Sequence, residues 1–156
     1  MNNTVIYLIG HSPAARLAVA QAIAAATGAR IVDSQALYAP IFNLIDHADL
    51  ATLPDAVWAE VDAVRGAVLR TIETASPKDW SFVFTHAGFD IPADVGVYRT
   101  VRATAERRGA RFLPVTLTSG ASKRPLLRFE ENQALAVAGD DPAAAAAQII
   151  RATSGA

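Results

Sequence analysis

The stretch Val5-Ile6-Tyr7-Leu8-Ile9-Gly10-His11-Ser12-Pro13-Ala14-Ala15-Arg16-Leu17 decides the fold. Its first five residues form an unbroken, β-prone apolar run, which is typical of a strand buried on both faces of a parallel sheet. Ser12 can cap a helix, and Pro13 suits the first helical position because it has no N–H to leave unpaired. We therefore expect a strand, a short loop after Gly10, and a helix that begins at Pro13 or Ala14 and stops at Gly28.

The rest of the chain alternates strands with helices. Further strands are predicted at 30–33, 80–85, 111–118 and 133–138, and helices at 34–46, 54–74, 93–108 and 142–152. The segment 34–46 should be only partly helical, interrupted near Pro40, and Pro114 indicates that part of its strand lies at an edge or a bulge. We expect Trp80 and the other aromatics of its strand in the core. This alternation predicts one α/β domain over 1–156, with a mostly parallel sheet and helices on both faces.

The composition narrows the classes of partner and location. Fourteen basic and fifteen acidic residues give a net charge of -1, which argues against a nucleic acid or a membrane surface recognised by bulk charge. There is no cysteine, which excludes disulfides, thiolate zinc sites and a cysteine nucleophile. The apolar run 5–9 follows no basic residue and is too short for a signal peptide or a membrane span, so we expect a cytoplasmic protein.

Ligands of open parallel sheets bind beyond the carboxyl ends of the strands, here at 10–16, 33–35, 85–90 and 118–123. The first of these has the position of a phosphate-binding loop, G-x-x-x-x-G-K-[ST], and Gly10 matches its first glycine. Ala15 stands where the second glycine frees the backbone, and Arg16 replaces the lysine. Leu17 replaces the hydroxyl that binds magnesium, and Pro13 removes one backbone donor.

Two interpretations of this loop stay open. Either Ser12 and Pro13 simply start the helix one turn early, or the loop is a phosphate cradle that has lost part of its donors. Some affinity for anions is expected in both cases, because the N-terminus of a helix attracts negative charge without any motif.

Several stretches, taken in order and spacing, carry a resemblance to a known group of proteins. They are 5–10, which leads into the alanine-rich helix, and then 28–33, 40–45, 53–58, 64–69, 79–85 and 111–118. Together they resemble the short bacterial P-loop kinase-like proteins related to shikimate and adenylate kinases. The resemblance covers roughly residues 4 to 118, with a weaker match in the closing strand and helix.

This resemblance implies a three-layer P-loop kinase-like fold, with five mostly parallel strands and the first strand between the third and the fourth. It also implies ATP and Mg²⁺ as cofactors. Asp33 would be the acceptor-site carboxylate, acting as a base or a magnesium contact. The nucleotide phosphates would contact Gly10, His11, Ser12, Ala14, Ala15, Arg16 and Leu17.

The chain departs from the family in two places. The loop has lost its lysine, its second glycine and its magnesium hydroxyl. After the fourth strand, where the family has an arginine-bearing lid, residues 118–124 run almost directly to the last strand. Both departures put the binding of ATP and Mg²⁺ in doubt.

Each candidate outside the loop has a structural alternative. Asp33 either contacts an acceptor or caps the following segment. Arg65 either clamps an anionic acceptor or lays its stem along the core edge. His86 either acts as an acid or base at a substrate site or is a polar loop residue. Lys123 and Arg124 either replace the lid cations or form a solvated pair, and the spacing of the three histidines predicts no metal site.

The sequence therefore favours a degenerate P-loop small-molecule kinase-like protein whose nucleotide phosphoryl transfer is impaired or lost. If it is active, it is an ATP-dependent small-molecule phosphotransferase in which Arg16 and Asp33 carry the catalysis. The alternative is a non-catalytic anion- or nucleotide-binding module, or a protein-interaction module, on the same scaffold. The expected partner is a small molecule or a nucleotide.

Overall fold

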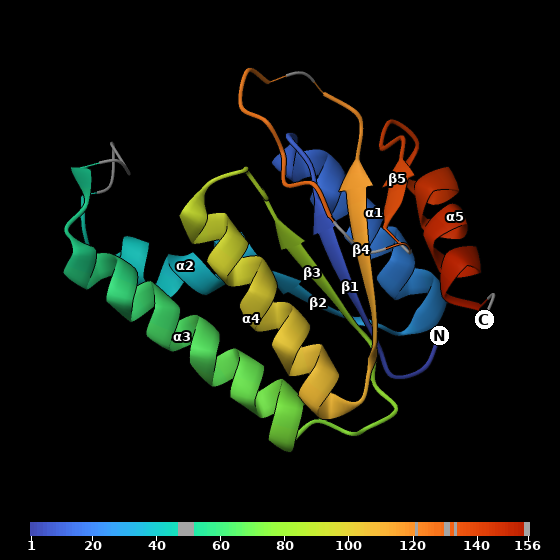
Figure 1. Cartoon of the computed structure of the whole chain (residues 1–156), viewed down its shortest axis with the longest axis horizontal. Coiled ribbons are helices and arrows are strands. Elements are labelled where there is room, and N and C mark those ends of the chain that lie inside the picture. The colour runs from blue at the N-terminus through green and yellow to red at the C-terminus, as the bar shows by residue number, and fades with distance from the viewer. Residues whose placement is uncertain (47–51, 121, 130–131, 133, 155–156) are drawn as a thin grey trace.

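The computed structural model describes residues 1–46, 52–120, 122–129, 132 and 134–154. Its strands form one sheet in the order β2-β3-β1-β4-β5, and every neighbouring pair is parallel (Figure 1). The strands are β1 (Thr4–Ile9), β2 (Arg30–Asp33), β3 (Phe82–His86), β4 (Arg111–Leu117) and β5 (Leu135–Val137). The predicted parallel α/β architecture is confirmed, and so is the place of the first strand between the third and the fourth.

Helices cover both faces of this sheet. α1 (Pro13–Thr27) and α5 (Pro142–Ser154) pack on one face, α3 (Asp55–Thr74) and α4 (Pro92–Arg108) on the other, and α2 (Ser34–Phe42) lies against α3 (Figure 1). β1 serves both layers because successive side chains of a strand point to opposite faces. Ile6 and Leu8 belong to the cluster under α1 and α5, whereas Val5, Tyr7 and Ile9 belong to the cluster under α3 and α4. Within the described residues, none of the helices has the length and apolar character needed to cross a membrane.

The helix ends follow the predicted signals. Ser12 caps α1, and Gly28 ends it with a φ of 74°, in the left-handed region that glycine adopts without steric cost. Asp141 caps α5, because its Oδ1 accepts hydrogen bonds from two amides of the first turn. The expected interruption near Pro40 is wrong, since α2 continues through this residue to Phe42. The Phe42 ring packs edge-on against Trp58 of α3, a tertiary contact that local propensity does not include.

Trp80 lies outside the core, contrary to the expectation. β3 begins at Phe82, and the Trp80 side chain is 39% exposed. The guanidinium of Arg30 lies 4.3 Å from the centre of its ring, so a cation–π contact covers one ring face. The predicted fifth strand is shorter than expected, and Gln133, its first predicted residue, lies outside the described residues.

Pro114 lies in the half of β4 that has a neighbour on one side. It pairs with Tyr7 of β1, whereas the described part of β5 pairs with residues 115–117 of β4. The first half of β4 is therefore an edge on its β5 side, where proline is tolerated. The expectation for Pro114 is confirmed.

Arg108 joins the end of α4 to the end of α3. The residue is 4% exposed, and its guanidinium donates hydrogen bonds to the carbonyls of Ile72, Ser76 (3.2 Å), Pro77 and Trp80 (3.4 Å). These carbonyls belong to the last turn of α3 and to its connection to β3, where backbone acceptors have no partner within the helix. One buried side chain thus provides hydrogen bonds to the backbone carbonyls of the segment where the chain reverses before β3.

We expect Arg108→Met to lower the free energy of unfolding by about 2–4 kcal/mol, because buried carbonyls lose a charged donor. Arg107→Met is the matched control, since Arg107 has a side chain that is 55% exposed and pairs with Glu73 at 2.9 Å. Loss of such a surface pair should cost less than about 1 kcal/mol. Urea denaturation of both variants measures the two losses, and equal losses would contradict the role given to Arg108.

Candidate functional site

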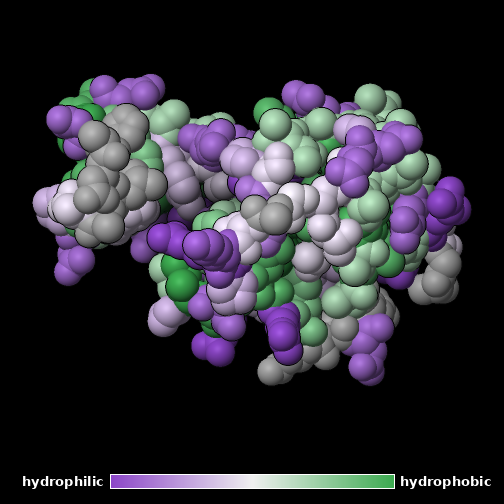
Figure 2. Space-filling view, turned by 90° about the horizontal axis from the view of Figure 1, so that it is seen from above, coloured by the Kyte–Doolittle hydropathy of each residue, from purple (hydrophilic) through white to green (hydrophobic). Residues whose placement is uncertain are grey.

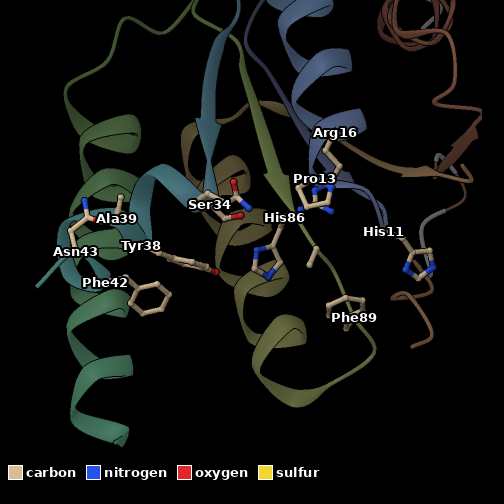
Figure 3. A pocket seen from close by; sticks show the side chains of 12 residues that line it. His11, Pro13, Arg16, Ser34, Tyr38, Ala39, Phe42, Asn43, His86 and Phe89 are labelled. Carbon is tan, nitrogen blue, oxygen red and sulfur yellow. The ribbon is translucent and has the colours of Figure 1, made fainter. Parts of the chain in front are cut away.

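A cleft opens at the carboxyl ends of β1 and β3. These neighbouring strands lead to opposite faces of the sheet, β1 into α1 and β3 into α4, and such a switch point leaves a crevice between the two loops. The cleft has a volume of about 580 Å³ and reaches from the start of α1 to α2 (Figure 3). Figure 2 looks onto this end of the molecule and shows hydrophilic and hydrophobic side chains intermixed. The lining residues are His11, Pro13, Arg16, Ser34, Gln35, Tyr38, Ala39, Phe42, Asn43, His86, Ala87 and Phe89.

The loop between β1 and α1 packs closely against the sheet. A side chain at Gly10 would place its Cβ 3.0 Å from the Cβ of Leu117 in β4, so packing against this strand favours a glycine here. The Ser12 hydroxyl accepts a hydrogen bond from the Ala15 amide at 3.2 Å, and the Ser12 carbonyl accepts one from the Arg16 amide at 3.1 Å. α1 begins directly after this cap, as expected. Two amides at the start of α1 are thus bound within the loop itself.

Arg16 is buried, with 5% of the residue exposed. Its Nη1 donates a hydrogen bond to the carbonyl of Gly10. Burial lowers the pKa of Arg16, and the negative charge of Asp33 opposes that effect. The predicted phosphate-binding cation therefore forms part of the cleft wall but is bonded back onto the loop.

Asp33 ends β2 and caps α2. Its Oδ2 accepts a hydrogen bond from the Ala36 amide at 3.2 Å, and its Oδ1 accepts one from the Thr85 hydroxyl at 2.5 Å. The structural alternative for Asp33 is thus present, and the carboxylate is not among the groups that line the cleft. Its contact with an acceptor stays a prediction.

Arg65 lies behind the cleft wall, with 12% of its side chain exposed. It pairs with Asp62, and its Nη2 donates a hydrogen bond to the Tyr38 hydroxyl at 3.3 Å. Burial raises the pKa of Tyr38, and the Arg65 charge and hydrogen bond oppose that effect. Figure 3 shows the Tyr38 hydroxyl pointing toward His86. Arg65 therefore reaches the cleft through Tyr38 and does not line it.

His86 ends β3 and is 6% exposed. Its Nε2 lies 3.1 Å from Oδ1 of Asp94 in the first turn of α4, close enough for an ion pair when the ring is protonated, although too oblique for a hydrogen bond. Asp94 also accepts a hydrogen bond from the Phe89 amide at 2.7 Å. Burial alone would raise the pKa of Asp94, but the contact with His86, the Phe89 amide and the charge of Arg65 together lower it. His86 thus enters the cleft with a carboxylate partner.

A strap, residues 125–127, lies against the loop that carries Phe89, one of the residues that line the cleft. Two backbone hydrogen bonds of 2.8 and 2.9 Å and one antiparallel bridge join it to residues 88–90 after β3. Just before the strap, the guanidinium of Arg124 lies 5.5 Å from the centre of the Phe89 ring, and Lys123 is exposed. Arg124 is therefore placed beside Phe89, while any role of Lys123 and Arg124 as lid cations stays a prediction.

The segments after β4 and β5 fill the other side of the loop. The Ser119 hydroxyl accepts a hydrogen bond from the Gly139 amide at 2.5 Å, and a Cβ at Gly120 would lie 3.7 Å from the Cβ of His11. Ala121, also part of the predicted site segment, lies outside the described residues. The start of α1 is therefore accessible through the cleft, on the side that faces α2.

Sequence reasoning did not single out Tyr38, Phe42 or Asp94, which shape the cleft, and it included Phe89 only as part of the loop 85–90. Tyr38 and Phe42 are four residues apart on α2, so they share one helix face. Their position just beyond the carboxyl end of β2 was a usable signal. Asp94 carried no such signal, because an acidic residue in the first turn of a helix is expected for the helix alone.

The described donors do not suit a Mg²⁺ ion, which prefers carboxylate and hydroxyl oxygens. No carboxylate appears among the described lining residues, and Leu17 presents an alkyl group in place of the loop hydroxyl. Over the described ranges there is also no group of three His, Asp or Glu residues that could hold a metal ion.

Comparison with known proteins rests on structure. No protein-family model matches the chain, and no curated protein matches its sequence. A candidate kinase from Chloroflexus aurantiacus is similar over 100% of both chains, with 11% identity and a TM-score of 0.68. APS kinase from Mycobacterium tuberculosis, solved in complex with AMPPNP and APS, is similar over 99% of both chains, with 13% identity and a TM-score of 0.61.

A gluconokinase from Sinorhizobium meliloti is also similar, over 96% of this chain and 89% of its own, with 18% identity and a TM-score of 0.58. The chain has the P-loop kinase fold. At these identities the likeness concerns the fold alone. The P-loop kinase-like scaffold expected from the sequence is confirmed.

We expect Gly88→Ala to destabilise the protein by about 2–4 kcal/mol, because strain at a positive φ adds to a steric overlap. Gly88 has a φ of +71°, and a Cβ there would lie 2.4 Å from Cγ2 of the buried Ile9. Gly96→Ala is the control, because Gly96 is an exposed residue of α4 and nothing lies within 4 Å of its added Cβ. It should stabilise the helix by about 0.5–1 kcal/mol. Thermal denaturation measures the stability of both variants. If Gly88→Ala is as stable as wild type, the loop adapts to the added side chain and the prediction is wrong.

The lowered pKa of Asp94 predicts a pH-dependent contribution to stability. The folded protein favours the ionised carboxylate, so this contribution is present above the usual pKa of 3.8 and is lost as the pH falls through the lower pKa of the folded state. Asp94→Asn should therefore be less stable than wild type near neutral pH, and the difference should shrink below about pH 4. Thermal denaturation over this range tests it, with the exposed Asp90→Asn as control. A gap that is constant with pH would contradict the prediction.

Proposed function

We propose that this chain is a degenerate small-molecule kinase-like protein that binds a small molecule in the cleft and whose nucleotide phosphoryl transfer is impaired or lost. The P-loop kinase fold supports the first part, since the similar structures include a gluconokinase, an APS kinase and a shikimate kinase. The alternative is a non-catalytic anion- or nucleotide-binding module, or a protein-interaction module, on the same scaffold.

The state of the loop carries the proposal. A phosphate cradle needs backbone amides and a compact cation that are free to face the ligand. Ser12 binds the amides of Ala15 and Arg16, and Pro13 has no amide to offer. The guanidinium of Arg16 donates to the carbonyl of Gly10. Two amides and the guanidinium of this loop are therefore engaged within it.

Loss of several such groups is severe for phosphoryl transfer. Catalysis of this reaction consists mostly of positioning and charge stabilisation. Removal of a single charge-stabilising donor typically costs about 10²–10³ in rate, and here the lysine, the second glycine and the hydroxyl are all replaced. Binding is affected less, because the N-terminus of α1 keeps its attraction for a negative group.

Calorimetry on the wild-type protein with ATP and with AMPPNP, each with and without Mg²⁺, tests the proposal. We expect weak binding that does not depend on Mg²⁺, and no transfer of phosphate. Tight, magnesium-dependent binding of ATP would contradict the impaired loop and favour an active phosphotransferase.

A repaired loop gives the sharper test. The triple variant Ala15→Gly, Arg16→Lys and Leu17→Ser should bind AMPPNP at least about tenfold more tightly in the presence of Mg²⁺, a gain of ~1.4 kcal/mol. The glycine frees the backbone, the lysine releases the Gly10 carbonyl, and the serine restores a metal ligand.

The matched control keeps the first two changes but carries Leu17→Ala, which removes the leucine without adding a hydroxyl. Its gain should not depend on Mg²⁺. Thermal denaturation verifies that both variants are folded. If the folded triple variant gains nothing, the interaction-module alternative replaces the proposal.

A further inference from the structure

Two arginines at the cleft, Arg16 and Arg65, each have a carboxylate of the protein nearby. Arg16 lies close enough to Asp33 for that carboxylate to favour its charged form against the effect of burial. Arg65 pairs with Asp62 behind Tyr38. An anionic ligand would compete with carboxylates already in place, so its charge would add little to the affinity.

The other polar groups of the wall are uncharged. Ser34, Gln35 and Asn43 line the cleft, and each can both donate and accept hydrogen bonds. Among the lining residues that the structure describes there is no carboxylate and no lysine. Figure 3 shows Ser34, Tyr38 and His86 gathered at the inner end of the cleft. A wall of this kind matches a ligand with several hydroxyl groups.

Aromatic rings supply the remaining surface. Tyr38 and Phe42 stand next to each other, with ring centres 5.6 Å apart, and Phe89 faces them from the loop after β3. The face of an aromatic ring is its negative side, so it attracts the weakly positive C–H bonds of a sugar or polyol. A few orienting polar groups on an apolar wall are also the usual composition of a small-molecule site.

His86 supplies an acceptor among these donors. Between the two tautomers of the neutral ring, the one with its proton on Nε2 is favoured, because a lone pair on this nitrogen would face the Asp94 carboxylate at 3.1 Å. The other ring nitrogen, Nδ1, then carries a free lone pair. A ligand hydroxyl can donate to this lone pair and accept in turn from a neighbouring hydroxyl or amide.

We propose that the cleft binds an uncharged, hydroxyl-rich molecule, a sugar or a polyol, and that His86 accepts a hydrogen bond from one of its hydroxyls. This inference rests on the proposed function and names the ligand class of the same cleft. The gluconokinase, the shikimate kinase and the APS kinase are named for acceptors that carry a negative charge, whereas another similar structure is named a sugar kinase. Asp94 acts as a positioning residue through the ring of His86.

Titration of ¹⁵N-labelled protein by NMR, without nucleotide, tests the ligand class. The probes are D-glucose, sorbitol and myo-inositol, compared with the matched anions D-gluconate and glucose 6-phosphate. We expect at least one neutral probe to shift the amides of 34–39 and 86–89 and to bind as tightly as its anionic counterpart. The proposal is overturned if no neutral probe shifts these amides at its highest soluble concentration, or if an anion binds more than about tenfold more tightly.

Variants of His86 and Asp94 test the acceptor. His86→Phe keeps a ring but removes the nitrogens and should weaken the neutral probe about tenfold, while His86→Gln restores an acceptor and should recover part of the affinity. Asp94→Asn should change the imidazole ¹⁵N shifts of His86 toward a mixture of tautomers and weaken binding, whereas Asp90→Asn should change neither. Unchanged affinity in folded His86→Phe, or unchanged imidazole shifts in Asp94→Asn, would refute these roles.

The two proposals fail in different ways. The sugar titration contains no nucleotide and no Mg²⁺. A negative result there would not change the conclusion that calorimetry gives about nucleotide binding by the loop. Tight magnesium-dependent ATP binding would overturn the impaired loop without changing which molecule the cleft accepts.

Discussion

The pairing of β1 with β3 on one side and β4 on the other is the constraint on which the cleft depends. Ile9, the last residue of β1, is level with His86 of β3 and Thr116 of β4. The loops that follow these strands therefore begin at the same level of the sheet. The Gly10 amide donates a hydrogen bond to the Ala87 carbonyl at 3.4 Å, and Gly10 packs against Leu117. A side chain at position 10 would press on Leu117, next to the loops that together make the cleft.

The same close packing gives Gly10 a role that does not depend on a phosphate ligand. Packing against the neighbouring strand favours glycine here, so its presence alone is weak evidence for a nucleotide site. Arg16 is likewise fixed by a bond to the protein itself. A residue at a motif position can thus have a structural role that does not depend on the chemistry of the motif.

The sequence predicted those features that depend on neighbouring residues. The unbroken apolar run 5–9, the Ser12 cap and the glycine after α1 each act through local geometry, and all three are present. The prediction that Trp80 lies in the core was wrong, because a cation–π contact with Arg30 stabilises the ring at the surface. The partnership of His86 and Asp94 was out of reach, since it depends on how α4 approaches β3 and not on any spacing in the chain.

The strap also anchors one edge of the cleft. Its two backbone hydrogen bonds and its bridge to the loop after β3 tie it to the central sheet, and Leu127 within it is buried. Displacing the strap would therefore expose part of the core. The opposite wall, α2, is held to α3 through the contact of Phe42 with Trp58. Both sides of the cleft are thus anchored in packed side chains, so its shape is set when the domain folds.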